Sequence, residues 1–301
     1  MKNLFSNKGL AYIAMACVMF LSSCKDNNKI DFTSNDASNI EGETTSDAFT
    51  SDATDISTDA VDGYNDTQLS GGRVDEVASF ATNDRLKCAK ITLTKTGTDP
   101  GSVAGVITIE FPADGTCADS RGNVRKGIIT ITYTGRKFVA GSKIVTTFTN
   151  YSVNGVKVEG THTLTNITAT TNDYPRFTAS ISGGKLTFLD GKTVTREQEF
   201  TREWQRAKDP TQDKWVLFKG SKAAGTTRNS TTYTMEVTID IVHSRACQIS
   251  NKVFIAVSGE KRFTTENKLI VVNYGDGSCD NIVTVTINGK TRDVTIKGDG
   301  N

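Results

Sequence analysis

One polar and aromatic stretch of the chain, Thr193–Arg206 (TVTREQEFTREWQR), holds the residue types best suited to binding a ligand. In an extended strand, alternate side chains share a face, so its arginines and its tryptophan project from the same side. A turn at Asp209-Pro210-Thr211 then returns the chain to a second tryptophan, nearly opposite the first. Tryptophan faces stack on sugar rings and arginines bind anionic groups. The candidate ligand-binding residues are therefore Arg196, Arg202, Trp204, Arg206 and Trp215.

A structural role is the alternative for these residues. Cross-strand aromatic pairs stabilise antiparallel sheets. The apolar stems of arginines cover such pairs while their charged ends stay in water. From the residues alone, a structural role as a cross-strand aromatic pair is preferred over a role in ligand binding.

Candidate catalytic groups are sparse. Glu197, Glu199 and Glu203 share one face of the same stretch, and a glycosidase needs two carboxylates roughly 5–9.5 Å apart; a solvated strand face is the preferred interpretation. The two histidines, His162 and His243, continue apolar strand faces and are expected to be structural. The sequence contains no Gly-x-Ser-x-Gly, His-Glu-x-x-His or phosphate-loop motif. No catalytic residue and no cofactor is predicted.

The cysteines beyond residue 24 are expected to form two disulfides. Four cysteines allow three pairings, and spacing alone does not choose among them. In the predicted hairpins, however, Cys88 precedes one strand and Cys117 follows the next, and Cys247 and Cys279 stand in the same relation. Each pair then lies side by side, which predicts Cys88–Cys117 and Cys247–Cys279. A four-thiolate zinc site is the rival, but the chain lacks a Cys-x2-Cys pair, so no metal is predicted.

The N-terminus resembles the signal of a bacterial lipoprotein. Lys2 and Lys8 precede an apolar segment, Leu10–Leu21, which is shorter than the ~20 residues of a transmembrane helix. The sequence Leu21-Ser22-Ser23-Cys24 is similar to the lipobox, where cleavage leaves an acylated cysteine at the mature N-terminus. This resemblance implies a signal peptide over 1–23 and a stable lipid anchor on Cys24.

Charge divides the mature chain into two parts. Cys24 to Asp84 contains 14 acidic and 3 basic residues, whereas Arg85 to Asn301 contains 30 basic and 20 acidic ones. Residues 24–72 are rich in Asp, Ser, Thr, Asn and Gly, a composition that buries too little apolar surface to offset the entropy of ordering. They are expected to form a disordered acidic tether. Residues 73–87 have apolar side chains at helical spacing and are expected to form a short helix or linker.

The remainder of the chain is expected to be all-β. Apolar and polar residues alternate over successive runs, punctuated by Asn-Gly, Asp-Gly and Gly-Gly pairs, as in antiparallel hairpins. The architecture is predicted to be an antiparallel meander forming a sandwich or an open barrel-like sheet system. A repeated order of strand, Asp-Gly-(Ser/Thr)-Cys and strand indicates two related β lobes, 88–190 and 191–301, or equally one continuous sheet. The main predicted strands lie within 91–95, 107–111, 129–134, 156–164, 235–241 and 283–287.

Several motifs over about 85–296 accompany the lipobox. They are Asp114–Cys117, Arg121–Gly127, Asn154-Gly155 with Val158–Thr161, Thr195–Glu197 with Thr201–Trp204, and Asp276–Asn281. This set resembles uncharacterised β-rich lipoproteins common in the Bacteroidota, a resemblance that implies no established activity. Lys25-Asp26 is similar in part to the acidic export signal of surface lipoproteins. Both the cell surface and the periplasmic face of the outer membrane therefore remain open.

Together these features predict a lipid-anchored outer-membrane protein with a non-enzymatic binding or structural role at the cell envelope. The positive charge of the body favours an anionic partner such as an acidic polysaccharide. The expected partners are the membrane, through the anchor, and a glycan or an envelope protein; nucleic acid is not expected for an exported chain. The alternative function is that of a carbohydrate-active enzyme or a glycan-binding accessory protein.

Overall fold

The structure is a computed structural model that describes residues 33–69, 84–96, 103–120, 122–251, 253, 255–265 and 268–296. All of these residues belong to one compact unit. The predicted signal peptide and Cys24 lie outside the described residues. Of the segment 73–87, predicted to be a helix or linker, only residues 84–87 are described, and they form a turn.

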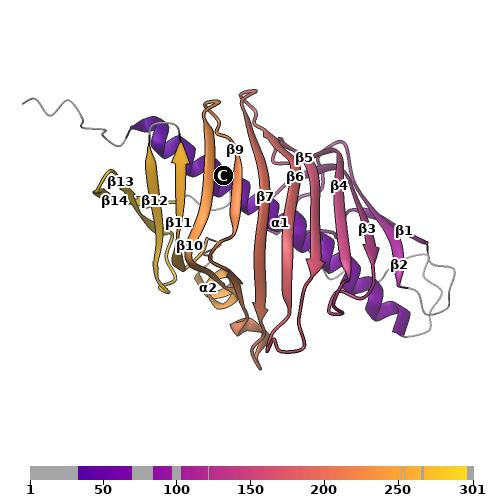
Figure 1. Ribbon diagram of the computed structural model, residues 1–301. Coiled ribbons are helices and arrows are strands. Elements are labelled where there is room, and N and C mark those ends of the chain that lie inside the picture. Colours follow the sequence, from indigo (N-terminus) through magenta and orange to yellow (C-terminus); the bar gives the residue numbers. More distant parts are fainter. Residues whose placement is uncertain are drawn as a thin grey trace, which may run out of the picture. The chain divides into compact units, whose positions relative to one another are not determined.

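The described part of the chain consists of one large sheet and a few helical segments (Figure 1). In chain order, the elements are α1 (Ser34–Leu69), β1 (Lys90–Lys95), β2 (Ala104–Phe111), β3 (Arg125–Thr134), β4 (Lys143–Val153), β5 (Val156–Asn166), β6 (Arg176–Thr187), β7 (Thr193–Gln205), the 3-10 turn η2 (Pro210–Gln212), β8 (Lys214–Leu217), β9 (Lys222–Thr226), β10 (Thr232–Ser244), α2 (Arg245–Asn251), β11 (Ser258–Thr265), β12 (Leu269–Asp276), β13 (Ile282–Ile287) and β14 (Lys290–Thr295).

The 14-stranded sheet is an antiparallel meander, as predicted. Neighbours in the sheet are neighbours in the chain, except that β8 and β9 lie end to end between β7 and β10. The strands form a single sheet, so the sandwich is not the form adopted. The boundary predicted between two lobes, at residues 190 and 191, falls in the turn of the β6–β7 hairpin, which is paired from Arg176↔Glu203 to Thr187↔Thr193. The described chain therefore follows the alternative of one continuous sheet.

Because apolar and polar residues alternate along the strands, one face of the sheet is apolar and buried. In β2 and β3, the residues Ile107, Ile109, Ile129 and Ile131 are at most 1% exposed, and the threonines between them point the other way. Because side chains in a strand alternate between faces, this pattern fixes which face meets the core.

Two register shifts interrupt the pairing in the middle of the sheet. One lies between Glu159 and Thr161 of β5, and the other between Ile181 and Gly184 of β6. Gly160 has a φ of +116°, and a Cβ atom there would lie 2.8 Å from the Cα of Gly184. Glycine is therefore required where β5 and β6 approach each other, and such bulges increase the local twist of the strands.

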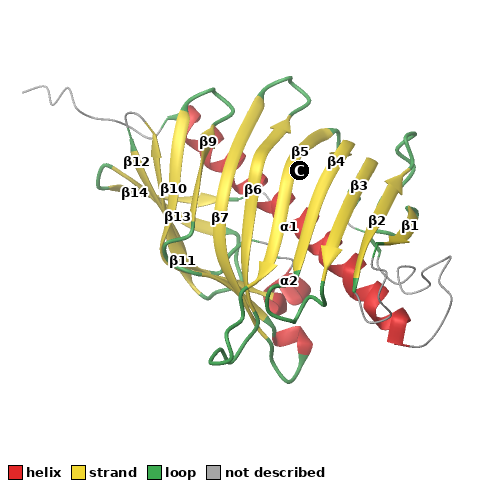
Figure 2. Ribbon diagram, turned by 45° about the vertical axis from the view of Figure 1, so that its right-hand side comes forward, coloured by secondary structure: helices red, strands yellow, loops and turns green. Residues whose placement is uncertain are grey.

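The helix α1 lies across one face of the sheet (Figures 1 and 2). Near its start, Asp36 forms an ion pair with Lys268, just before β12, and near its end Asp59 pairs with Arg85, just before β1. Thr33 caps the helix: its hydroxyl accepts from the amide of Asp36 at 3.3 Å, and the Asp36 carboxylate accepts from the amide of Thr33 at 2.7 Å. This reciprocal pair is the arrangement of a capping box.

The helix α1 corrects the prediction of a disordered tether over 24–72 for residues 34–69, whereas residues 24–32 and 70–72 lie outside the described residues. Aspartate, serine, threonine, asparagine and glycine are poor helix formers in isolation, which is why their abundance predicted disorder. In the structure, Ile40, Phe49 and Ile56 are buried with at most 7% exposure, and several carboxylates of α1 meet cations of the sheet. Tertiary contacts thus stabilise a helix that its own composition does not favour.

Candidate functional site

The two tryptophans of the predicted site stack on each other. Trp204 of β7 and Trp215 of β8 are direct cross-strand partners. Their ring centroids are 5.3 Å apart and their planes differ by 17°. Asp213 holds the turn between them, because it accepts hydrogen bonds from Trp204 Nε1 at 3.0 Å and from the amide of Ala207 at 2.8 Å. The predicted juxtaposition of the two rings is therefore present.

Two of the predicted arginines lie against this pair. The guanidinium of Arg202 lies 4.8 Å from the ring centroid of Trp215, and that of Arg206 lies 5.8 Å from that of Trp204. Cations over aromatic faces are attracted by the ring quadrupole. Partial burial lowers the pKa of Arg202, and the charge of Asp55 on α1 opposes that shift.

A loop between β3 and β4 adds two residues that sequence reasoning missed. Phe138 lies 5.6 Å from Trp204, and the guanidinium of Arg206 lies 5.3 Å from the Phe138 ring. The Lys137 ammonium lies 5.3 Å from Trp204 and 5.2 Å from Phe138. A loop has no periodicity, so no pattern in the sequence pointed to these residues. The cluster Lys137, Phe138, Arg202, Trp204, Arg206 and Trp215 is called the aromatic–arginine stack below.

Arg196 does not belong to this stack, which corrects one residue of the predicted site. It is 3% exposed and donates to Glu43 of α1 at 3.0 Å, to Asp47 of α1 at 2.5 Å and to Gln198 at 2.7 Å. Arg196 shares a strand face with Trp204, as predicted, but α1 covers the part of that face where it lies. Its neighbours, and therefore its role, depend on the helix.

Arg196 is part of an ionic cluster between α1 and the sheet. Lys261 of β11, also 3% exposed, lies 2.8 Å from Asp47 and 3.6 Å from Glu43. Partial burial alone would raise the pKa of Asp47, but the positive charges of Arg196 and Lys261 outweigh it and lower that pKa to about 2. Burial would lower the pKa of Lys261, and the charge of Asp47 raises it instead. Asp47 and Lys261 therefore remain ionised at neutral pH.

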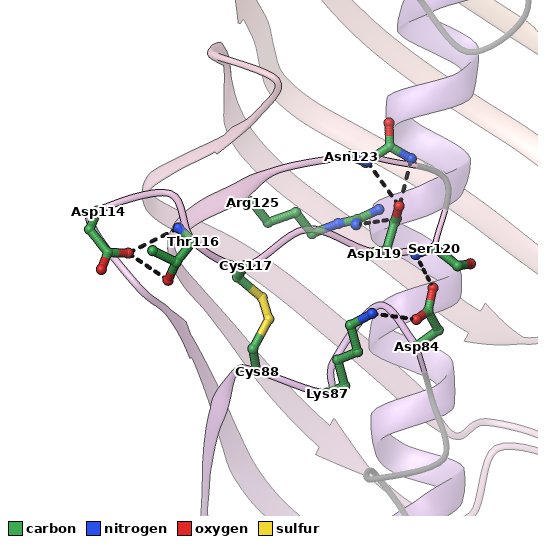
Figure 3. The surroundings of a disulfide bond; sticks show 10 residues. All are labelled: Asp84, Lys87, Cys88, Asp114, Thr116, Cys117, Asp119, Ser120, Asn123 and Arg125. Atoms are coloured by element: carbon green, nitrogen blue, oxygen red, sulfur yellow. Dashed lines mark hydrogen bonds and ion pairs between the residues drawn. A yellow bond between two sulfur atoms is a disulfide. The ribbon is translucent and has the colours of Figure 1, made fainter.

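A second ionic cluster joins α1 to the other end of the sheet, beside a disulfide (Figure 3). Arg125 of β3 is 2% exposed and donates to Asp119 at 2.6 Å and to Asp52 of α1 at 3.0 Å. Asp52 also accepts from Arg85 at 3.3 Å. Asp119 is oriented by the amide of Asn123, which donates to it at 2.9 Å.

Both predicted disulfides are present. Cys88 pairs with Cys117 and Cys247 pairs with Cys279, with Cα–Cα distances of 5.6 Å and 5.1 Å. The first disulfide joins the segment before β1 to the connection between β2 and β3, close to Asp84 and Asp119 (Figure 3). Each bond connects the two ends of a hairpin, which is the geometry that the strand assignment predicted.

The two histidines have different surroundings. Burial, together with the charge of Arg196, lowers the pKa of His162 to about 4, so its ring is neutral at pH 7. It lies edge-on to Phe148 at 5.0 Å, in a small cavity beneath α1 that Thr50 and Ser57 also line. His243 of β10 is the cross-strand partner of Trp215, so the two residues lie side by side on neighbouring strands.

The three glutamates considered for catalysis do not converge. Glu197 accepts from the amide of Gly183 at 2.7 Å, and Glu203 forms an ion pair with Arg176 at 2.7 Å. Glu199 is exposed, opposite Lys222 of β9. Their observed contacts are those of residues that join neighbouring strands.

Searches of the described residues for a metal site and a membrane-spanning helix, and comparisons with known proteins, bear on the nature of the site. Within the described residues, no group of three or more His, Cys, Asp or Glu side chains is placed to hold a metal ion. In the same part of the chain, neither helix combines the length and apolar content needed to span a bilayer. No protein-family model, curated protein or solved structure matches the chain. The interpretation of the site therefore depends on its own geometry.

Proposed function

We propose that this protein is a lipid-anchored, non-enzymatic protein of the bacterial cell envelope that binds an anionic glycan through the aromatic–arginine stack. The observation that supports the binding role is the row of rings and cations formed by Arg202, Trp215, Trp204, Phe138 and Arg206. Aromatic faces and guanidinium groups together recognise a sugar ring that carries a carboxylate or sulfate.

The geometry specifies how such a ligand would bind. The facing sides of Trp204 and Trp215 cover each other, and Arg202 lies over Trp215. The outer members are Phe138, which is 43% exposed, and Arg206, which is exposed. In this proposal the apolar face of a sugar packs on Phe138 while its acidic group pairs with Arg206. The tryptophans form the rigid base beneath them.

The lipid anchor and the compartment are supported by observations other than the aromatic–arginine stack. The resemblance of Leu21–Cys24 to a lipobox supports an anchor on Cys24, ten residues before the start of α1 at Ser34. The two disulfides are consistent with an oxidising compartment outside the cytoplasm. The positive charge of the body over Arg85–Asn301 would favour association with acidic polymers of the envelope or its surroundings.

The test is a binding titration followed by tryptophan fluorescence, which the two stacked rings make sensitive to this site. The probes are an oligogalacturonate and a neutral maltooligosaccharide of equal length. We expect saturable binding of the acidic probe alone, weakened about tenfold by Arg206→Ala because a charge-assisted hydrogen bond is lost. Phe138→Ala should weaken it to a similar degree.

The chain offers a matched control. Arg228 also lies over an aromatic ring, 4.2 Å from Phe188, and pairs with Asp190 near the opposite end of β7. Arg228→Ala removes the same charge and should leave binding unchanged. Equal losses in the Arg206 and Arg228 variants would show that only net charge matters, and the absence of binding to a panel of acidic glycans would reject the glycan-binding role.

A further inference from the structure

The helix α1 has the composition of a segment that folds only when it is bound. Its sequence contains carboxylates throughout, no lysine or arginine, and two internal glycines, Gly42 and Gly63. Such residues disfavour an isolated helix, and helices without tertiary support are marginal in water. The helical state of α1 therefore depends on the face of the sheet that it covers.

The contacts of α1 combine buried apolar side chains with ion pairs, as in a helix bound to the surface of another protein. Apolar anchors recur along the length of the helix, at Ile40, Phe49, Ile56 and Val61, each at most 7% exposed. Acidic anchors occur between and beside them. Their pairs with the sheet and its flanks are Asp36–Lys268 at 2.6 Å, Glu43–Arg196 at 3.0 Å, Asp47–Lys261 at 2.8 Å, Asp52–Arg125 at 3.0 Å and Asp59–Arg85 at 2.5 Å.

The sheet face beneath α1 is complementary in charge to an acidic helix. In the described residues, the carboxylates that pair with Arg196, Lys261 and Lys268 all belong to α1. Arg196 and Lys261 are each 3% exposed when α1 is in place. A cation that is buried without a carboxylate is costly, so any segment that covers this face in place of α1 must present acidic groups at matching positions.

We propose that α1 docks reversibly, and that the sheet face beneath it is a binding surface for an acidic helix of a partner protein. The partner segment would present apolar side chains at the places of Ile40, Phe49 and Ile56. Its carboxylates would occupy the places of Glu43 and Asp47, facing Arg196 and Lys261. When no partner is bound, α1 occupies this surface. The proposal is independent of glycan binding and of the acylation of Cys24.

A covalent lock on α1 tests this proposal. The hydroxyls of Ser57 on α1 and Thr146 on β4 are 2.8 Å apart, so the pair Ser57→Cys and Thr146→Cys is placed to form a disulfide that holds the helix down. The probe is a fluorescent peptide with the sequence of residues 33–69, titrated into the full mature chain and followed by anisotropy. Ser57→Cys alone is the control, since it carries a thiol without the lock.

We expect saturable peptide binding to the unlocked protein and to the single-cysteine control. The locked protein should bind at least ~10-fold more weakly, since its own helix cannot leave. A peptide carrying Glu43→Gln and Asp47→Asn should also bind at least ~10-fold more weakly, because charge-assisted contacts to Arg196 and Lys261 are lost.

Hydrogen exchange on the full chain provides the second measurement. If docking is reversible, amides of α1 exchange through an opening that leaves the amides of β5, β6 and β7 protected. Exchange of α1 only together with those strands would overturn reversible docking. Absence of peptide binding to the unlocked protein, or equal binding to the locked one, would overturn the proposed surface whatever the exchange result.

Discussion

Replacing Arg196 with methionine tests the ionic cluster that holds α1. Methionine keeps much of the apolar volume of the arginine stem but removes the charge, so Glu43, which is 4% exposed, loses its partner at 3.0 Å. Removing one partner of a buried ion pair costs about 3–5 kcal/mol. Lys261 still lies 2.8 Å from Asp47 and 3.6 Å from Glu43. We therefore expect a loss near the lower end, about 3 kcal/mol.

The loss of free energy should appear in the opening of α1, because the contact of Arg196 with Glu43 joins α1 to the sheet. A change of about 3 kcal/mol corresponds to an increase of ~100-fold in the equilibrium constant for opening α1. Native-state hydrogen exchange of the α1 amides measures this constant directly. Urea unfolding of the whole chain measures whether the sheet is affected as well.

A surface pair supplies the control for this prediction. Lys222 and Glu236 are 3.9 Å apart, with side chains 68% and 53% exposed, and exposed pairs of this kind contribute about 0–1 kcal/mol. Lys222→Met should thus leave α1 exchange unchanged. If Arg196→Met alters the opening free energy of α1 by less than about 1 kcal/mol, a value typical of surface pairs, the buried ion pairs are not what holds the helix.

Three further predictions concern other parts of the chain. Replacing Cys88 and Cys117 together by alanine opens a loop of sequence separation 29 and should lower the free energy of unfolding by about 3–4 kcal/mol in urea titrations; no loss would show that the bond does not restrict the unfolded chain. Burial lowers the pKa of His162 to about 4, below the ~6.5 of a histidine in the unfolded chain. The stability that the neutral ring contributes is therefore complete above pH ~6.5 and is lost as the pH falls toward 4. His162→Gln should therefore remove up to about 3 kcal/mol of the difference in unfolding free energy between pH 7 and pH 4, and an unchanged pH dependence would contradict the assignment. Cys24→Ser should abolish incorporation of radiolabelled palmitate and move the protein from the membrane to the soluble fraction, whereas labelling that persists would exclude Cys24 as the anchor.

The sheet was predictable because its determinants are local. Alternation such as Ile129-Thr130-Ile131-Thr132 specifies a strand with one buried face, and Asn154-Gly155 specifies the turn between β4 and β5, where Asn154 and Gly155 both have positive φ. Once the hairpins were placed, the cysteine pairs followed from them. The stacking of Trp204 on Trp215 followed in the same way, from a strand, a turn and a returning strand.

The helix α1, and Lys137 and Phe138 of the candidate site, were not predictable in this way. The acidic segment 34–69 and the basic body were recognised as opposite in charge, but their separation in the sequence concealed that they pack together. Glu43 and Arg196 are 153 residues apart in the chain, and no period or motif connects them. Phe138 reaches Trp204 from a loop that carries no pattern either.

The strands, their turns and the disulfide pairs could be predicted from the amino-acid sequence, because each depends on side chains a few residues apart or on hairpins built from them. Three features depend on packing between distant segments: the acidic segment is helical, Arg196 faces α1 instead of the tryptophans, and Phe138 joins the aromatic–arginine stack. The physical reason is that helix formation in Ser34–Leu69 is favourable only where buried cations and apolar side chains of distant strands meet it. Contacts with distant strands thus offset the low helix propensity of this segment, and no local pattern in the sequence reveals such contacts.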